Sequence, residues 1–117
     1  MLAEDDHEVR NLTKRVLENF GYRVVEAVDG EDAVMKYHKQ GAAIDLLLFD
    51  VIMPRKNGKE AYLEIKQIRP DIKVLFTSGY TEEIIHKKGI LDPDMVFIMK
   101  PISPTMLLRK VREVLDK

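Results

Sequence analysis

The chain has 117 residues, of which 45% are hydrophobic and 33% charged, so it is long enough to form one domain with a buried core. Nineteen Lys and Arg against 20 Asp and Glu give a net charge of −1, which excludes a general attraction to nucleic acid or to an anionic membrane. The absence of Cys excludes disulfides and thiolate zinc sites, and because neither a signal peptide nor a membrane-spanning apolar run is found, we expect a cytoplasmic protein.

The first two strand–helix pairs lie in the first third of the chain. Met1–Ala3 is a short apolar strand, and the acidic cluster Glu4-Asp5-Asp6 follows it. Apolar residues at steps of three and four then predict a helix that Gly21 closes. A β-branched strand over residues 22–28 leads to a second helix over residues 30–40, capped by the Asp before it. The residues expected to face the core from the first helix are Val9, Leu12, Val16, Leu17 and Phe20.

Residues 46–49 form an unbroken apolar run, which is typical of a central strand in a parallel sheet that is covered on both faces. The run ends at Asp50, and Pro54 with Asn57-Gly58 predicts a loop after it. Asp50 is therefore expected at the carboxyl edge of the sheet, where open α/β folds bind ligands. This stretch alone leaves two interpretations open: Asp50 is a functional carboxylate, or it only ends the strand and caps the next turn.

Helices and strands continue to alternate after this loop. The third helix stops at Arg69-Pro70, and strands are expected over residues 72–76 and 95–99. Thr81 caps the fourth helix and Ser103 the fifth, in which Pro takes the first position. The core residues expected in the third and fifth helices are Ala61, Ile65, Ile68, Leu107, Leu108, Val111, Val114 and Leu115.

Five strands that alternate with five helices predict an α/β domain, because right-handed crossovers place helices on both faces of a parallel sheet. In such a sheet the carboxyl ends of all strands lie along one edge. Four of the predicted strands end in groups that can do chemistry: Glu4 and Asp5, then Asp50, Thr77 and Lys100. Each of these residues alone is more often an ordinary strand end. Their occurrence at four strand ends favours a shared functional site.

The chemistry of these groups points to phosphoryl transfer. Carboxylates held close together repel one another unless a cation joins them, and a hard divalent ion such as Mg²⁺ prefers oxygen ligands. A Lys and a hydroxyl supply donors for a phosphoryl group, so an Asp can act as the nucleophile and form an aspartyl-phosphate. The His residues have no metal-like spacing and are expected to be solvated; they are His7, His38 and His86.

The chain resembles response regulator receiver domains, the CheY-like phosphoacceptor modules of two-component signalling. The resemblance covers essentially the whole chain and lies in four motifs: Glu4-Asp5-Asp6, Asp50-Val51-Ile52-Met53-Pro54 with Asn57-Gly58, Thr77-Ser78-Gly79 and Lys100-Pro101. It implies a flavodoxin-like three-layer α/β sandwich, with five helices and a five-stranded parallel sheet in the order 2-1-3-4-5. It also implies a signalling domain over residues 1–117 that phosphorylates and dephosphorylates itself but turns over no metabolite.

The resemblance implies a role for each matching acidic residue. Asp50 would accept the phosphoryl group from phosphohistidine on a histidine kinase or a histidine phosphotransfer domain. Mg²⁺, or Mn²⁺, would be bound directly by Asp5 and Asp50, through water by Glu4, and by the backbone carbonyl of Ile52. The implied partners include neither nucleic acid nor membrane.

Further residues match the switch of this family. Lys100 would pair with the phosphate, and its bond to Pro101 is cis in many relatives. Thr77 would move towards the phosphoryl group, and Phe97 would fill the space that Thr77 leaves; the alternative is that Phe97 is a plain core aromatic. The face formed by residues 95–115 is our first expectation for a partner surface, and phosphorylation-dependent dimerisation is one outcome of the switch.

The chain departs from the usual family pattern in places that affect function. The side chains of Ile52 and Gly79 cannot hold a hydrolytic water, so we expect a long-lived phosphoryl group. Only three apolar residues precede Glu4, which indicates that the first strand is truncated relative to the family. Residues 77–81 resemble receivers of hybrid sensor histidine kinases, and a free-standing regulator is the alternative.

Functions from other classes are weaker. A phosphorylation-independent docking module would be expected to lack the Asp or the Lys, and both are present. A metal-dependent phosphatase with an Asp nucleophile, such as a haloacid dehalogenase-like enzyme, needs a second Asp where this chain has Ile52. A flavin-binding protein of the same fold would need a hydroxyl-rich loop where Glu4-Asp5-Asp6 would repel phosphate. A phosphorelay receiver is therefore the prediction.

Overall fold

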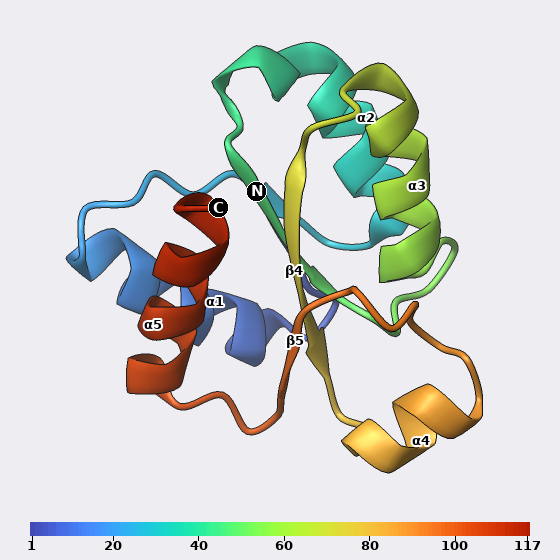
Figure 1. The fold of residues 1–117 in the computed structure, drawn as a ribbon. Helices are drawn as coiled ribbons and strands as arrows, with labels where there is room; N and C mark the ends of the chain where they lie inside the picture. Colours follow the sequence, from blue (N-terminus) through green and yellow to red (C-terminus); the bar gives the residue numbers. More distant parts are fainter.

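Five parallel strands form the centre of the computed structural model, which describes residues 1–117 (Figure 1). The strands are β1 (Leu2–Ala3), β2 (Glu26–Ala27), β3 (Leu46–Asp50), β4 (Lys73–Ser78) and β5 (Phe97–Met99). Their order across the sheet is β2-β1-β3-β4-β5, so the predicted flavodoxin-like sheet is confirmed. All four ladders between neighbouring strands are parallel, which places every carboxyl end at the same edge.

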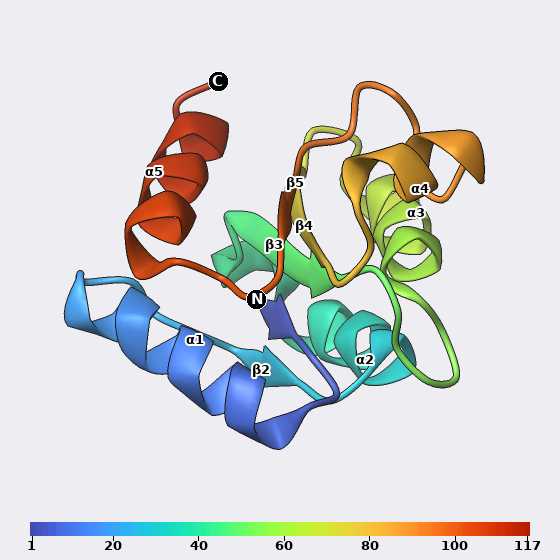
Figure 2. The same ribbon diagram turned by 90° about the horizontal axis from the view of Figure 1, so that it is seen from below.

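Five α-helices cover the two faces of this sheet. They are α1 (His7–Asn19), α2 (Gly30–Gln40), α3 (Gly58–Ile68), α4 (Glu82–Lys87) and α5 (Pro104–Leu115), with a short 3-10 helix at Gly41–Ala43. Figure 2 shows α1 and α5 on one side of the sheet and α2, α3 and α4 on the other, which is the predicted three-layer sandwich. None of the helices combines the length and the apolar character that crossing a membrane requires.

The core has two halves because alternate residues of the strands point to opposite faces. Leu47 and Phe49 of β3 pack in the cluster under α2, α3 and α4, whereas Leu48 packs in the cluster under α1 and α5. The two-sided burial predicted for this strand is therefore confirmed. The stripe of α5 also faces the core as predicted, with Leu107, Val111 and Val114 buried and Leu108 and Leu115 half-buried.

Side-chain caps explain where the helices begin. The predicted caps are all present, since Asp29, Thr81 and Ser103 each accept a hydrogen bond from a backbone N–H in the first turn. Two caps were not predicted: Asp6 begins α1, and Asn57 begins α3 with a reciprocal capping box. At the other end of α1, Gly21 has a φ of 90°, which is the left-handed conformation that the prediction required.

Some predicted strand boundaries are wrong. The strand predicted over residues 22–28 shrinks to β2, because β1 offers only Leu2 and Ala3 as ladder partners. The strand predicted over residues 95–99 begins two residues later, at Phe97. In contrast, β4 continues past the predicted end at residue 76, because its last residues pair with the end of β3 and with β5.

The periodic pattern also misplaced three core residues. Leu12, Phe20 and Ile68 were predicted to be buried but are 65%, 68% and 51% exposed. Thr13 is buried on α1 instead, and its hydroxyl donates to the carbonyl oxygen of Val9 at 2.8 Å. This bond satisfies the hydroxyl within the helix, so a polar residue can occupy a core position that an apolar stripe does not reveal.

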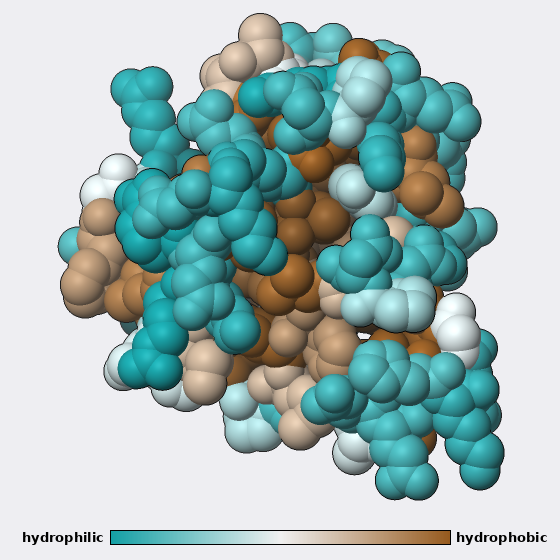
Figure 3. Space-filling model, in the orientation of Figure 1, coloured by the Kyte–Doolittle hydropathy of each residue, from teal (hydrophilic) through white to brown (hydrophobic).

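The amino-terminal edge of the sheet carries an apolar groove of about 480 Å³. Met1 lies in this groove, where its α-amino group donates to the carbonyl oxygen of Leu46 at 2.8 Å. Burial lowers the pKa of this α-amino group to about 6, although Asp45 opposes the shift. Figure 3 shows apolar surface in the middle of the view, between α5 and the layer of α2 and α3.

Candidate functional site

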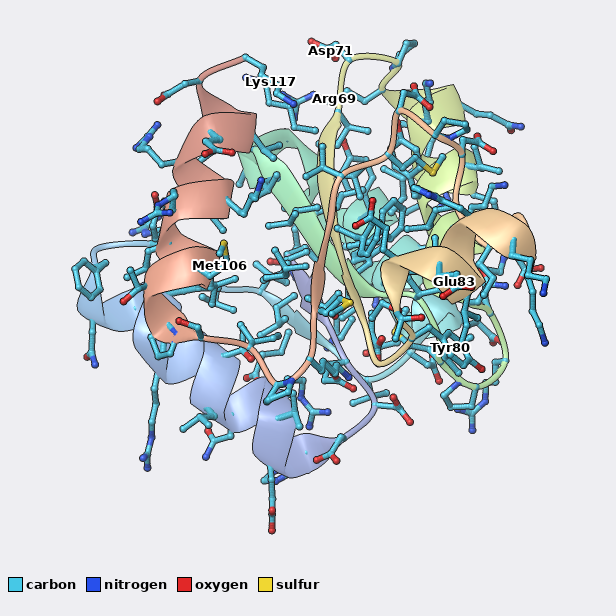
Figure 4. The ribbon with its side chains drawn as sticks, turned by 60° about the horizontal axis from the view of Figure 1, so that its bottom comes forward. Arg69, Asp71, Tyr80, Glu83, Met106 and Lys117 are labelled. Atoms are coloured by element: carbon cyan, nitrogen blue, oxygen red, sulfur yellow. The ribbon has the colours of Figure 1, made fainter.

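The two ends of the sheet differ in the residues that they carry. Figure 4 shows Tyr80 and Glu83, which follow β4 at its carboxyl end, far from Arg69, Asp71 and Lys117 at the other end of the sheet. The residues predicted to carry the chemistry lie at the carboxyl ends of β1, β3, β4 and β5, with Asp50 as the last residue of β3 and Thr77 as the last but one of β4. The candidate site is therefore described from the groups that meet at this edge.

Lys100 joins two buried carboxylates that lie far apart in the sequence. Its Nζ donates to Oε1 of Glu4 at 2.6 Å and to Oδ2 of Asp50 at 2.9 Å. The two acidic residues are only 3% and 6% exposed. Although burial disfavours a charged ammonium, the hydrogen bonds to these carboxylates raise the pKa of Lys100 above its usual range. Lys100 is therefore the charged partner of both acids at neutral pH.

Glu4, Asp5 and Asp50 form the acidic cluster of the site. Each offers one carboxylate oxygen, and these oxygens all lie within 4.8 Å of one another. The side chain of Asp5 is exposed, whereas those of Glu4 and Asp50 are buried. Loss of water around Asp5 and its hydrogen bond with Glu4 raise the pKa of the Asp5 carboxyl. A donor set made only of oxygens, with one member open to solvent, fits a hard divalent cation such as Mg²⁺ or Mn²⁺.

Arg10 holds the first of these strand ends, and the sequence interpretation missed it. Its Nη1 donates to the backbone carbonyl oxygen of Glu4 at 2.7 Å, and its Nε lies 3.4 Å from Oε1 of Glu26. The guanidinium group therefore ties α1 to the ends of β1 and β2. The available signal was weak: Arg10 lies one helical turn after Asp6, the residue that caps α1.

Thr77 lies beside Asp50 across the β3–β4 ladder. The two residues are register partners, and the N–H of Val51 donates to the carbonyl oxygen of Thr77 at 2.9 Å. Thr77 is buried, with 4% of its surface exposed. Register partners in parallel strands present their side chains to the same face, so the hydroxyl of Thr77 belongs to the same region as the Asp50 carboxylate.

The loop after Asp50 closes on itself. The N–H of Gly58 donates to the carbonyl oxygen of Val51 at 3.0 Å, so both ends of the loop meet at the end of β3. A Cβ at position 58 would lie 2.2 Å from the carbonyl oxygen of Asp50, which only Gly avoids. Ile52 lies on the first arm of this loop and is 53% exposed.

Phe97 and Pro101 flank Lys100 on the last strand and the following loop. Phe97 is half-buried on β5, where it pairs in register with Phe76 and meets the ring of His86 edge-on at a centroid distance of 6.5 Å. The Lys100–Pro101 peptide bond is cis. The His side chains are exposed as predicted, namely His7, His38 and His86.

Known proteins share both the sequence pattern and the fold. A family model described as the response regulator receiver domain matches residues 1–112. The sensor kinase CckA of Brucella abortus is 35% identical over 117 residues, which cover all of this chain but 12% of that kinase. The chemotaxis protein CheY of Treponema pallidum is 30% identical over 116 residues, which cover 98% of this chain and 81% of that protein.

Solved structures agree with this result. The receiver domain of the hybrid histidine kinase CckA superposes with a TM-score of 0.82 and 32% identity, covering 97% of this chain and 95% of that one. CheY in the CheX–CheY–BeF3–Mg complex from Borrelia burgdorferi also gives a TM-score of 0.82, with 28% identity and coverage of 99% and 87%.

Proposed function

This chain belongs to the response regulator receiver domain family of two-component signalling, and we propose that Asp50 is the residue that accepts its phosphoryl group. The observation that carries the proposal is the bridge that Lys100 makes between Glu4 and Asp50. It joins a nucleophile to a fixed positive charge at the edge where oxygen ligands for a cation also meet. Phosphoryl transfer needs this combination, because the protein contributes mainly position and charge.

Asp50 acts as the nucleophile in this proposal. One of its carboxylate oxygens attacks the phosphorus of a phosphohistidine, so that an O–P bond forms as the P–N bond breaks. The electron pair of the P–N bond stays on the donor imidazole, which is protonated from solvent. Lys100 keeps its positive charge throughout and pairs with an oxygen of the transferred phosphoryl group.

The acidic cluster would hold the divalent cation. Asp5 and Asp50 would bind Mg²⁺ or Mn²⁺ directly, Glu4 through water, and Ile52 through its backbone carbonyl oxygen. When bound, the cation would neutralise charge that develops on the phosphoryl oxygens. The relative that was crystallised as a complex with BeF3 and Mg supports this assignment.

Thr77 and Phe97 would carry the signal away from Asp50. The Thr77 hydroxyl would donate to a phosphoryl oxygen, because Thr77 is the register partner of Asp50 on the adjacent strand. Phe97 would then move into the vacated space, and since its ring has no hydroxyl, its two positions differ in packing alone. The altered face includes α4, β5 and α5, and the change is a shift between two populations.

The proposed donor is a histidine kinase or a histidine phosphotransfer domain in the cytoplasm. The domain would signal by changing its affinity for a protein partner over residues 95–115, and dimerisation on phosphorylation is one form of that change. It would catalyse its own phosphorylation and dephosphorylation and would turn over no metabolite.

Incubation with acetyl phosphate and Mg²⁺, followed by intact mass spectrometry, tests the assignment. We expect the protein to gain the mass of one phosphoryl group, and we expect no gain in Asp50→Asn. The matched control is Asp116→Asn, which changes an exposed carboxylate at the end of α5 and should gain the group normally. A parent protein that gains nothing would favour a docking module that works without phosphorylation.

A further inference from the structure

A second pair of charged groups lies beside the loop that follows Asp50. Nη1 of Arg55 donates to Oδ2 of Asp29 at 2.5 Å, and Asp29 is 3% exposed. The other carboxylate oxygen of Asp29 accepts from the N–H of Asp32 at 2.7 Å, because Asp29 caps α2. One buried carboxylate therefore serves both the start of a helix and the middle of the loop.

The backbone of the loop docks at the same place. The N–H of Gly30 donates to the carbonyl oxygen of Lys56 at 3.1 Å, and a Cβ at position 30 would lie 2.1 Å from that oxygen. Arg55 has a φ of 66°, a left-handed conformation that residues other than Gly rarely adopt. An unfavourable backbone conformation persists only where the surroundings hold it, and the ion pair with Asp29 is such a restraint.

This contact connects the two halves of the acidic site. The loop that contains Arg55 also contains Ile52, and it begins and ends at the tip of β3. Asp29 follows β2, which pairs with β1, and the N–H of Glu4 donates to the carbonyl oxygen of Ala27 at 3.2 Å. The pair therefore joins the loop after Asp50 to the strand pair that presents the other acids.

We propose that the ion pair between Asp29 and Arg55 positions the loop after Asp50 so that the carbonyl of Ile52 and the acidic cluster bind one divalent cation. This inference rests on the proposed function, and it makes Asp29 and Arg55 positioning residues that touch neither the cation nor the phosphoryl group. Although burial disfavours a charged carboxylate, the hydrogen bonds from the Asp32 N–H and from Arg55 lower the pKa of Asp29. The pair is thus charged throughout the neutral range.

The test is the dissociation constant of Mg²⁺, measured by titration calorimetry on the 117-residue chain, beside the thermal midpoint of each variant. Arg55→Gly leaves Asp29 without its cation but relieves the left-handed backbone, so these opposing effects should leave its thermal midpoint close to that of the parent. We expect its Mg²⁺ affinity to fall by about tenfold, the lower end of what the loss of an outer partner of a metal site costs. Asp29→Asn keeps the helix cap and should weaken binding to a similar extent.

Two further variants separate positioning from general stability. Arg55→Lys keeps a positive charge opposite Asp29 and should restore most of the affinity. Arg112→Asn removes an exposed ion pair at the end of α5 and should bind Mg²⁺ like the parent. Parent-like affinity in both Arg55→Gly and Asp29→Asn would overturn the inference, while phosphorylation of Asp50 would stand. If the parent binds no Mg²⁺, or if Asp50→Asn binds Mg²⁺ as tightly as the parent does, the proposed cation site and the inference are refuted together.

Discussion

Asp50 and Thr77 are register partners at the ends of two neighbouring strands of the sheet. Their spacing is set by the β3–β4 ladder, which continues through the hydrogen bond from the Val51 N–H to the Thr77 carbonyl. The hydroxyl and the carboxylate are therefore positioned by the most extensive ladder of the sheet. In the proposed switch, only the response of Thr77 to a phosphoryl group on Asp50 would require movement.

Replacing Thr77 should separate phosphorylation from its consequence. Thr77→Val keeps the shape of the side chain and removes the hydroxyl, so Asp50 should still accept a phosphoryl group. The shifts of the backbone amides of residues 97–99 on adding beryllofluoride and Mg²⁺, followed by NMR, should shrink. Thr77→Ser retains the hydroxyl and should respond like the parent. Equal shifts in Thr77→Val and the parent would rule out a hydrogen bond from Thr77 as the trigger.

Removing Lys100 should destabilise the fold as well as impair phosphorylation. Lys100→Met leaves Glu4 and Asp50 buried without their cation, which should lower the free energy of unfolding by roughly 2–4 kcal/mol. Because the pKa of Lys100 is raised in the folded state, its contribution is complete below its unfolded value of about 10.4 and is lost only at higher pH. Urea unfolding at about pH 7 measures the loss of unfolding free energy in Lys100→Met. In the presence of Mg²⁺ part of this loss should be recovered, because the bound cation would neutralise the carboxylates. An unchanged midpoint would contradict the prediction.

Adding a polar side chain at position 52 should shorten the lifetime of the phosphoryl group. The Ile52 side chain is exposed, so Ile52→Asn can place an amide in solvent beside the loop and orient a water molecule. We expect hydrolysis to become roughly tenfold faster, a modest share of what a positioned proton-transfer group provides. The decay of phosphorylated protein with Mg²⁺, followed by intact mass, gives the rate. Ile52→Val is the control and should decay like the parent, whereas equal decay in all three proteins would argue against a role for this side chain.

Two Gly residues near the site should differ sharply in their tolerance of a methyl group. A Cβ at position 58 meets the Asp50 carbonyl oxygen at 2.2 Å, whereas a Cβ at position 79 has no neighbour within 4 Å. Gly58→Ala should therefore lower the free energy of unfolding by about 1–3 kcal/mol and also weaken Mg²⁺ binding. Gly79→Ala should change the unfolding free energy by less than about 0.5 kcal/mol. Similar urea midpoints for the two variants would contradict the close approach at Gly58.

In the 117-residue chain, the α-amino group of Met1 should make stability depend on pH. Its pKa is about 6 in the folded chain, against an ordinary value of 8.0 in the unfolded chain, so the unfolded chain binds more protons between these values. The free energy of unfolding should consequently rise by roughly 1–2 kcal/mol from about pH 6 to about pH 8. Urea unfolding across this range measures the slope. The same chain acetylated at Met1 should lack this component, and identical slopes in the two proteins would exclude it.

The sequence predicted the helices, the strands and the helix caps more reliably than the strand boundaries and the limits of each buried helix face. Asp29 and Gly30 marked the start of α2 because a cap is a local property of a few neighbouring residues. The prediction that Leu12 and Phe20 are buried was wrong, because a helical period identifies an amphipathic segment without fixing how wide its buried face is. The length of β2 depended on β1, a partner elsewhere in the chain, which no local pattern reports.

The sequence likewise predicted some residues of the candidate site and missed others. Glu4, Asp50 and Lys100 could be grouped from the sequence, because parallel strands bring their carboxyl ends to one edge. The pair between Asp29 and Arg55 could not, because it depends on a left-handed Arg in a loop, and sequence gives no reason to place a residue other than Gly in that conformation.

The sheet is finished on both sides by very short strands, since β2 has two residues and β5 has three. Such short edge strands offer few unpaired backbone N–H and C=O groups to an edge strand of another molecule. Pairing between the edge strands of different molecules leads to aggregation and fibrils. The short edge strands therefore protect the domain from joining copies of itself through its backbone.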